Sequence, residues 1–192
     1  MTSTTQTTLE APAAIGGMSH DERALLLELL EGSRDRLRSA IEAAAEDCWR
    51  KKPADGGWSA AECAEHLVLC EETLLGMIRG QILAGPANPE GAAAVRGKDG
   101  IVIQAIHNRG MRLKTFPFLE PTGQWSGRRS ALDEFLKRRA ATVRYAAHAT
   151  EPLHLHVAPL GELGPIDAYQ WMLLLAAHTD RHLAQMQEAL AG

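Results

Sequence analysis

The sequence predicts an all-α fold, an up-down four-helix bundle with one long crossover loop. Three observations predict it. Apolar residues recur at helical spacing in four long segments, serine-led capping motifs mark two helix starts, and no long stretch alternates at the two-residue period of a strand. Four rods joined by two short connections and one long one are typical of a helical bundle.

The first two predicted helices each begin at a Ser-x-x-Glu capping box, in which the serine and the glutamate satisfy each other's backbone N–H groups. The first box starts at Ser19, and apolar residues then recur at helical spacing to about Trp49. The second box starts at Ser59, and its apolar pattern continues to Gly85-Pro86, a pair that ends helices. We therefore expect both segments to be long rods of the bundle.

The segment of residues 85–125 carries the fewest helical signals. Pro, Gly and Asn dominate up to Gly100, residues 101–113 could hold a short helix, and residues 116–125 have an extended pattern. A connection of this length between packed helices is uncommon and often covers a functional site. It is either a lid or a plain crossover between distant helix ends.

The third and fourth predicted helices follow this segment. The third covers about residues 127–148. The fourth begins at Pro165, because proline suits the first helical position, and it has Asp167 in its first turn to complement the helix dipole. It runs to about residue 191. Residues 153–157 alternate at period two, but one short segment does not make a sheet.

Length and charge predict a single domain that binds neither nucleic acid nor an anionic membrane. The chain of 192 residues fits one domain at residues 18–192, and the polar, then Ala-, Pro- and Gly-rich residues 1–17 predict a disordered N-terminal tail. The net charge of −4 provides no basic surface for nucleic acid or for an anionic membrane. Acidic residues break up the basic clusters of residues 128–139, which we interpret as a solvated helix face.

Cysteine usage and the N-terminal residues predict a cytoplasmic protein. The three cysteines are odd in number and show no Cys-x-x-Cys spacing, so they predict neither a disulfide framework nor a zinc ribbon. The first residues lack the charged and apolar regions of a signal peptide, and no apolar run approaches the roughly 20 residues that span a bilayer. Reduced thiols in the cytoplasm are the simplest explanation.

Three histidines form the most informative pattern in the chain. His178 and His182 lie four residues apart, and residues at this spacing share one face of a helix. His66 lies on another predicted amphipathic helix, which could face them across a bundle core. Three imidazoles would hold one divalent cation and leave coordination positions open, as in a catalytic rather than a structural metal site. Imidazole suits zinc, nickel, copper or iron alike.

Plainer explanations exist for each of these residues. A single histidine is usually a hydrogen-bonded core or surface residue, and an isolated pair at this spacing binds metal in a minority of cases. Cys63 and Cys70 share a side of the helix with His66 and could join a mixed site, although small core residues are the commoner case. Glu62 is either a cap or a hydrogen-bond acceptor for a ligating imidazole, and we favour the cap.

Other polar residues predict less. We expect Glu65 and Asp180, which neighbour the candidate ligands in sequence, to face solvent. His154 and His156 would chelate only on a strand, and the flanking prolines favour structural or exposed roles. The chain has no Gly-x-Ser-x-Gly, phosphate-binding or dinucleotide motif, and its aromatic fraction of 5% argues against a base-stacking surface.

Three motifs resemble those of the DinB-like, YfiT-related superfamily of metalloproteins. They are Trp58-Ser-x-x-Glu-x-x-x-His66, Pro121-Thr-Gly-Gln-Trp-Ser126, and Gly161-x-Leu-Gly-Pro-Ile-Asp-Ala-Tyr-Gln-Trp171 followed by His178-x-x-x-His182-x-x-Gln185. The resemblance covers about residues 20–190. It implies an up-down four-helix bundle, often a homodimer, with a divalent metal held by His66, His178 and His182. Relatives also imply transfer or isomerisation reactions that use low-molecular-weight thiols.

These observations lead to two hypotheses. In the first, zinc, nickel or iron bound by the three histidines lowers the pKa of a thiol cofactor or of water, and the resulting nucleophile attacks a small-molecule substrate, as in a transferase or a hydrolase. In the second, the metal only braces two helices of a non-catalytic dimeric module. The candidate pocket residues are Trp58, Glu62, Cys70, Trp125, Trp171 and Gln185.

Overall fold

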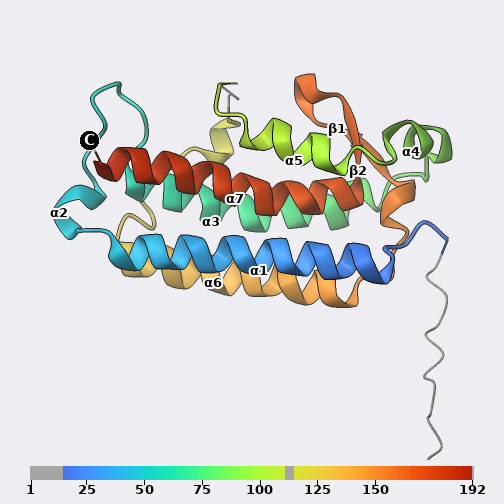
Figure 1. Ribbon diagram of the computed structural model, residues 1–192, viewed down its shortest axis with the longest axis horizontal. Coiled ribbons are helices and arrows are strands. Elements are labelled where there is room, and N and C mark those ends of the chain that lie inside the picture. The colour runs from blue at the N-terminus through green and yellow to red at the C-terminus, as the bar shows by residue number, and fades with distance from the viewer. Residues whose placement is uncertain (1–14, 111–114, 192) are drawn as a thin grey trace, which may run out of the picture.

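The structure is a computed structural model that describes residues 15–110 and 115–191. These residues form seven α-helices and one two-stranded ribbon, so the predicted all-α class is confirmed. Four helices are long: α1 (His20–Ala43), α3 (Ala60–Met77), α6 (Arg128–His148) and α7 (Ala168–Ala191). Figure 1 shows them side by side along the long axis, and α1 and α3 each pack against both α6 and α7.

Capping boxes start the first two long helices, as the sequence predicts. At α1, the Glu22 N–H donates to Ser19 Oγ at 3.2 Å, and the Ser19 N–H donates to the Glu22 carboxylate at 2.7 Å. The same two bonds join Ser59 and Glu62 at the start of α3, at 3.3 and 2.8 Å. Two N–H groups without helical partners are thereby satisfied at each start.

The first long helix is shorter than its apolar pattern. α1 ends at Ala43, the next two residues are extended, and a separate turn of helix, α2 (Glu46–Trp49), follows. This bend places Trp49 in the core, where its side chain is fully buried and its indole N–H donates to the Ser126 carbonyl at 2.9 Å. Burial of this large ring explains why the chain leaves the helix while the apolar pattern continues.

The second rod ends near the predicted position. Directly after α3, the rod continues as a wider π-helical turn, η1 (Ile78–Ile82). The Gly85 N–H then donates to the carbonyls of Gln81 and Ile82, which ends the rod. A short helix that the sequence did not predict, α4 (Pro89–Val95), follows shortly afterwards. Asn88 caps it by accepting a hydrogen bond from the Gly91 N–H at 2.9 Å.

The rest of the middle segment is only partly as predicted. The short helix expected at residues 101–113 corresponds to α5 (Asp99–His107), which packs along α7; the end of the expected range lies outside the described residues. Within residues 116–125, expected to be extended, a 3₁₀ turn, η2 (Pro117–Leu119), replaces part of the extended chain. Its proline fixes the backbone angle that the turn requires.

The connection into the last helix contains a small ribbon. The connection runs through the 3₁₀ turn η3 (Leu153–Leu155), strand β1 (Val157–Pro159), the 3₁₀ turn η4 (Gly161–Leu163) and strand β2 (Pro165–Asp167), and the two strands form the ribbon. The strands pair antiparallel, with Ala158 opposite Ile166. The alternating residues 153–157 therefore form no long strand, although β1 begins at their end.

The fourth long helix begins later than the sequence predicts. Because Pro165 and Asp167 belong to β2, α7 starts only at Ala168, and the predicted start at Pro165 is wrong. The Gln170 N–H donates to the Asp167 carboxylate at 2.8 Å, and the Asp167 N–H donates to the Gln170 side chain at 3.1 Å. Asp167 is thus the cap of α7 rather than a residue of its first turn, and this pair is a third capping box.

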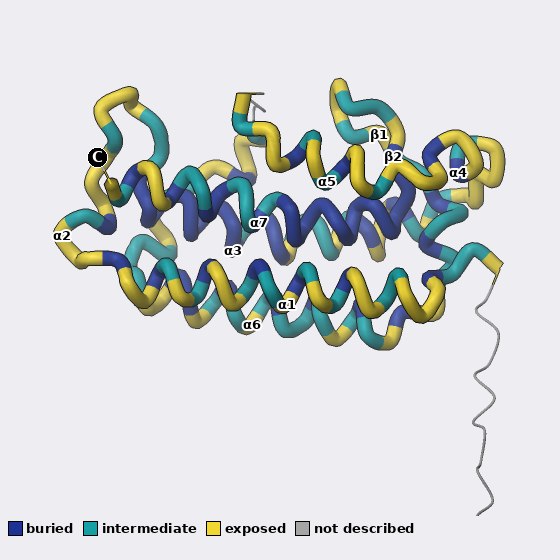
Figure 2. The backbone as a smooth tube through the Cα atoms, viewed as in Figure 1, coloured by how far each residue is buried: buried dark blue, intermediate teal, exposed yellow. Residues whose placement is uncertain are grey.

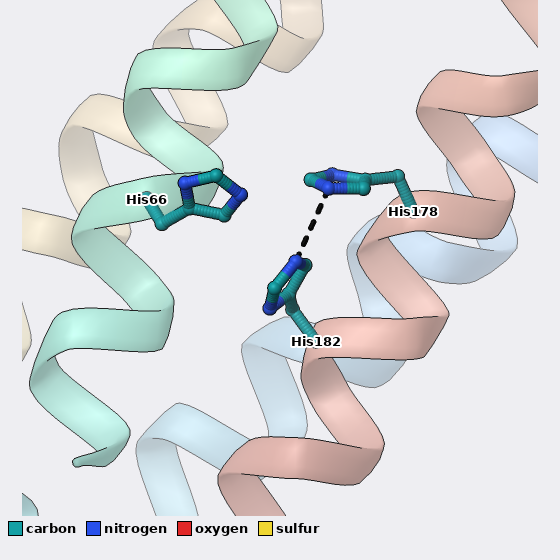
Figure 3. A group of neighbouring side chains, drawn as sticks. All are labelled: His66, His178 and His182. Carbon is teal, nitrogen blue, oxygen red and sulfur yellow. Dashed lines mark hydrogen bonds between the residues drawn. The ribbon is translucent and has the colours of Figure 1, made fainter. Parts of the chain in front are cut away.

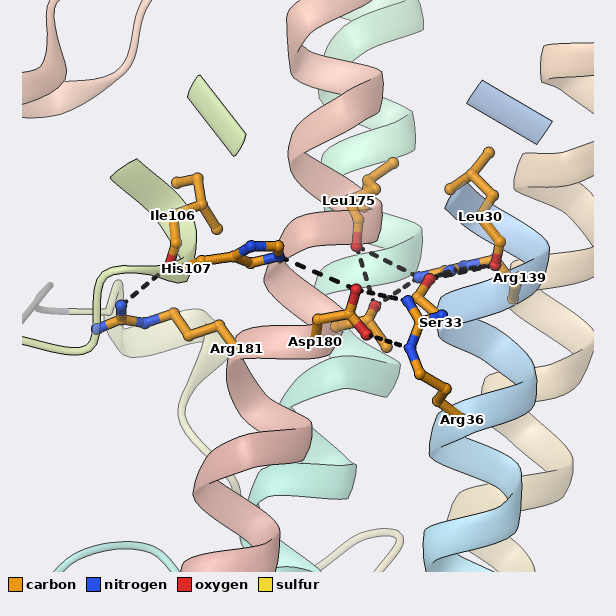
Figure 4. Close-up of polar contacts among 10 residues, drawn as sticks. Leu30, Ser33, Arg36, Ile106, His107, Arg139, Leu175, Asp180 and Arg181 are labelled. Carbon is orange, nitrogen blue, oxygen red and sulfur yellow. Dashed lines mark hydrogen bonds and ion pairs between the residues drawn. The ribbon is translucent and has the colours of Figure 1, made fainter. Parts of the chain in front are cut away.

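A buried polar layer separates two apolar clusters of the core. Figure 4 shows Ser33 and Arg139, two residues of this layer. The layer takes residues from all four long helices: Ser33, Glu71, Arg139, Thr142 and Thr179. The Arg139 guanidinium donates to the Glu71 carboxylate at 2.9 Å, and to the Ser33 and Thr179 hydroxyls at 2.8 and 2.6 Å. Thr142 donates to the other Glu71 oxygen at 2.8 Å. The two buried charges are therefore paired and hydrogen-bonded, which offsets their desolvation.

The most buried rods are α3 and α7. Figure 2 shows both of them dark blue along much of their length, whereas α1 and α6 expose one face. Residues 168–177 of α7 are all buried. Any polar side chain that these two helices direct toward each other is consequently shielded from water.

Two expectations concern the chain as a whole. Within residues 15–110 and 115–191, no helix is long and apolar enough to cross a membrane. Of the predicted tail, residues 1–14 lie outside the described residues. Residues 15–17 lead into α1, and the Gly16 carbonyl accepts a hydrogen bond from the His154 N–H at 2.9 Å.

Candidate metal centre

Three histidines from two helices converge in one place. His66 of α3 and His178 and His182 of α7 offer ring nitrogens that all lie within 4.8 Å of one another. Figure 3 shows the His66 ring directed from α3 toward the two rings of α7. The Nε2 atoms of His178 and His182 are 3.1 Å apart. The fold thus brings together the three histidines that the sequence indicates as candidate ligands.

The turn of α7 between its two histidines is bonded to three other helices (Figure 4). Thr179 accepts a hydrogen bond from Arg139 of α6 at 2.6 Å. Asp180 accepts two from Arg36 of α1, at 2.7 and 3.0 Å. Arg181 donates to two carbonyls at the end of α5, at 3.0 and 2.6 Å. Asp180, expected to face solvent, is therefore an ion-pair partner with a side chain only 22% exposed.

A backbone carbonyl orients the histidine of α3. His66 Nδ1 lies 2.8 Å from the Leu119 carbonyl oxygen. Because a carbonyl oxygen can only accept, Nδ1 carries the proton and Nε2 keeps its lone pair. Ligating histidines commonly donate their second ring N–H in this way, and the bond fixes both tautomer and ring direction.

Burial keeps the three imidazoles neutral. Desolvation lowers the pKa of His66, and it lowers the pKa of His178 and of His182 well below the ordinary histidine value. For the two α7 histidines, the neighbouring rings act in the same direction, because a second positive charge close by is unfavourable. Neutral imidazole is the form that binds a metal, so the cluster is in that form at neutral pH.

Three of the candidate pocket residues lie beside the histidines. The Trp58 ring centroid is 4.8 Å from that of His66 and 5.9 Å from that of His182. Cys70 Sγ is 3.4 Å from His66 Nε2, and burial raises the pKa of this thiol. Gln185, one turn beyond His182, interacts with that imidazole and raises its pKa against the larger effect of burial.

The other three candidates make their contacts elsewhere. Glu62 caps α3 and pairs with Lys52 at 2.7 Å, so the cap that we favoured is its role in the fold. The Trp125 ring lies 4.8 Å below the Arg138 guanidinium. Trp171 is buried in the apolar cluster at the other side of the polar layer.

Two residues of the centre were not found from the sequence. Leu119 acts through its backbone carbonyl, which no side-chain pattern reveals. Glu65 was expected to face solvent, and this expectation is wrong: the residue is 1% exposed and accepts hydrogen bonds from the N–H groups of residues 122–124. Residues 63–68 of α3 are all buried, so an acidic residue within a helical stretch that is apolar on nearly every side is the signal that could have indicated it.

The donor set fits a divalent cation. Two nitrogens bound to one cation at about 2.0–2.1 Å lie roughly 3 Å apart, and those of His178 and His182 are separated by 3.1 Å. His66 completes a group of three, the one group of this kind within residues 15–110 and 115–191. Cys63 does not belong to it: the side chain is fully buried in an apolar cluster, and burial raises the pKa of its thiol to about 12.

A different histidine environment lies near the start of α7. His154 Nδ1 donates to the Asp167 carboxylate at 2.9 Å, and its Nε2 is 3.3 Å from the Glu22 carboxylate. The Asp167 hydrogen bond raises the pKa of His154. This residue ties η3 to α1 and β2, which is the structural role that the flanking prolines favoured.

A comparison with protein families agrees with this geometry. The family model of the DinB superfamily matches residues 29–186, a range that contains all three clustered histidines. No curated protein and no solved structure matches the chain. The DinB superfamily is metal-binding. Since the match covers most of the chain, this protein belongs to the DinB superfamily.

Proposed function

We propose that the protein is a divalent-metal-dependent enzyme that acts on small electrophiles, as a thiol-dependent S-transferase or as a hydrolase. The observation that carries the proposal is the convergence of three neutral imidazoles, with no carboxylate in the group that the described residues form. Imidazole ligands suit zinc, nickel or iron. Three protein ligands leave positions for a small molecule, as in catalytic sites.

In this proposal the cation and the protein side chains have different chemical roles. When bound, the cation supplies Lewis acidity that lowers the pKa of a thiol or of water toward neutrality. His66, His178 and His182 hold it, and the half-buried Trp58 ring covers two of these imidazoles with an apolar surface. Because burial raises the pKa of Cys70, that thiol is a poor nucleophile, so the nucleophile would come from a low-molecular-weight thiol or from water.

Preorganisation supports a catalytic role. The α7 turn that carries two of the ligands is bonded to α1, α5 and α6, and the third ligand is oriented by the Leu119 carbonyl. Ligands held in this way need little rearrangement when a cation and a substrate arrive, which lowers the barrier of the reaction.

The alternative is a non-catalytic module in which the metal braces α3 against α7. One observation favours it: Cys70 Sγ lies 3.4 Å from His66 Nε2 and would close the coordination sphere as a fourth protein ligand. The raised pKa of the metal-free thiol sets a cost against it, since Cys70 would have to lose its proton on coordination.

Turnover assays distinguish the two functions. The purified protein, loaded with zinc, nickel or iron in turn, is incubated with a panel of low-molecular-weight thiols and electrophiles, beside metal-stripped protein and a His182→Ala variant. The enzyme proposal expects turnover that disappears in both controls. No turnover in any metal-loaded form, together with a large drop in the melting temperature on chelation, would support the brace instead.

The same proposal extends to architecture and assembly. We infer an up-down four-helix bundle from the packing of α1 and α3 against α6 and α7, and a homodimer from the resemblance of the motifs to the DinB-like family. We infer a cytoplasmic location from the free cysteines Cys48, Cys63 and Cys70. Light scattering after size exclusion measures the assembly: a mass of twice 20.8 kDa supports the dimer, and a mass of 20.8 kDa contradicts it.

A further inference from the structure

We propose that Glu65 is a positioning residue of the metal centre: its buried carboxylate holds the loop of residues 119–126 in the conformation that lets the Leu119 carbonyl orient His66. Glu65 precedes His66 on α3, so one helix turn carries both the ligand and the anchor of the loop that orients it. The consequence for metal binding rests on the proposed function; the consequence for the loop and the His66 ring does not.

The carboxylate of Glu65 is bound by consecutive backbone groups. Oε1 accepts hydrogen bonds from the N–H groups of Thr122 and Gln124 at 3.0 and 2.9 Å, and Oε2 accepts one from the Gly123 N–H at 2.9 Å. The Thr122 hydroxyl also donates to Oε1, at 3.2 Å. Successive N–H groups that converge on an anion form a nest, and a carboxylate as buried as this one requires such partners.

The Glu65 contact lies between the other attachments of the loop. On one side, the Leu119 carbonyl accepts from His66 at 2.8 Å; on the other, the Ser126 carbonyl accepts from the Trp49 indole at 2.9 Å. Gly123, at the centre, has a φ of +90°, a conformation that disfavours any residue with a Cβ. The loop conformation is therefore specified at its middle by the carboxylate and a glycine.

Loss of this anchor should act on the His66 ring. Neutral imidazole can carry its proton on either nitrogen, and the Leu119 carbonyl selects Nδ1. Nε2 is then left with a lone pair on the side of the ring that faces α7, as Figure 3 shows. If the loop moves away, this selection disappears, and Nε2 can carry the proton instead of accepting a cation.

Glu65→Gln tests the proposal in the metal-free protein. The amide keeps the shape of the side chain but replaces one acceptor oxygen with a donor. We expect amide hydrogen exchange at residues 122–124 to become about tenfold faster or more, because bonds to a charged acceptor are lost. We also expect ¹⁵N NMR at about pH 8, where histidine is neutral, to show His66 losing its Nδ1–H tautomer. Zinc affinity should fall about 10–100-fold.

Glu62→Gln is the matched control. This carboxylate lies one turn earlier on the same helix and bonds to Ser59 and Lys52, not to the loop. Its substitution should weaken the cap of α3 while the exchange rates at residues 122–124 and the His66 tautomer stay as in the wild type. A stability effect alone would therefore appear in both variants, whereas a positioning effect appears only at Glu65.

Gly123→Ala provides a second variant if Glu65→Gln does not fold. A Cβ at this position meets open space, so the change strains only the backbone of the loop and leaves the carboxylate in place. It should shift the same exchange rates and the same tautomer. Unchanged exchange and an unchanged His66 tautomer in the folded variant would overturn the proposal. If both change but wild-type protein binds no zinc, the proposed function fails and the positioning role stands.

Discussion

Two places beside α7 hold histidines, a cluster of three and the single residue His154, and the surroundings of the two places differ in their acidic partners. His178 and His182 face His66 without a carboxylate in the group, and burial lowers the pKa of all three. His154, near the start of the helix, lies between the Asp167 and Glu22 carboxylates, and its pKa is raised. Acidic partners therefore decide the role: without them a buried imidazole stays neutral and can bind a cation, and with them the charged form is favoured and the imidazole ties elements together.

The largest expected effect is on metal content, which should fall when a histidine of the cluster is replaced but not when His154 is. His182→Ala should reduce bound metal from about one ion per chain to almost none, because two imidazoles hold a cation far less tightly than three. Elemental analysis of the purified protein measures this, and far-UV circular dichroism should show nearly unchanged helix content. His154→Ala is the control and should keep its metal. Stoichiometric metal in His182→Ala would refute its assignment as a ligand.

Proton titration of the metal-free protein sharpens the comparison. NMR of the ring protons against pH should give His154 a midpoint above the ordinary value of about 6.5, and His66, His178 and His182 midpoints below it. The physical reasons are the Asp167 hydrogen bond in the first case and desolvation in the second. A reversed order would mean that the two environments have been assigned wrongly.

A smaller effect concerns stability at the His154 tie. Since its folded pKa is raised, its contribution is fully present below the unfolded value of about 6.5 and is lost as the pH rises through the folded pKa. His154→Gln should lower the free energy of unfolding by about 1 kcal/mol at about pH 5.5 and by less at about pH 9. Urea denaturation at the two pH values measures the difference.

The opposite sign is expected at the three-histidine group. Its folded pKa values are lowered, so metal-free protein loses stability as the pH falls below about 6.5, when the unfolded chain takes up protons that the folded chain does not. His178→Gln removes one such residue and should become more stable relative to wild type on acidification. Equal pH dependence in the two proteins would contradict this account.

Much of the fold was predictable because its signals are local. The capping boxes at Ser19 and Ser59 and the apolar periodicity locate three of the four long helices. The errors arise where tertiary contacts override local pattern. Burial of Trp49 bends the chain after α1, and pairing of β1 with β2 delays α7 to a cap at Asp167. Neither contact is visible in a window of a few residues.

The sequence predicted the side chains of the site that could bind a metal, but not the backbone groups that support them. The spacing of His178 and His182 places both on one face of a helix, and the fold brings His66 to them. The supporting groups belong to the backbone: the Leu119 carbonyl accepts a hydrogen bond from His66, and the N–H groups of residues 122–124 donate hydrogen bonds to Glu65. Every residue type has these groups, so their role depends on where the loop lies, which sequence alone does not specify.

X-ray absorption spectroscopy of zinc-loaded wild-type protein tests the central claim most directly, because it counts the atoms around the ion. Three imidazole nitrogens at about 2.0–2.1 Å, with no sulfur neighbour, are the predicted result. A sulfur neighbour at about 2.3 Å, which would identify Cys70 as a ligand and favour the brace, or fewer than three imidazoles, would contradict the account.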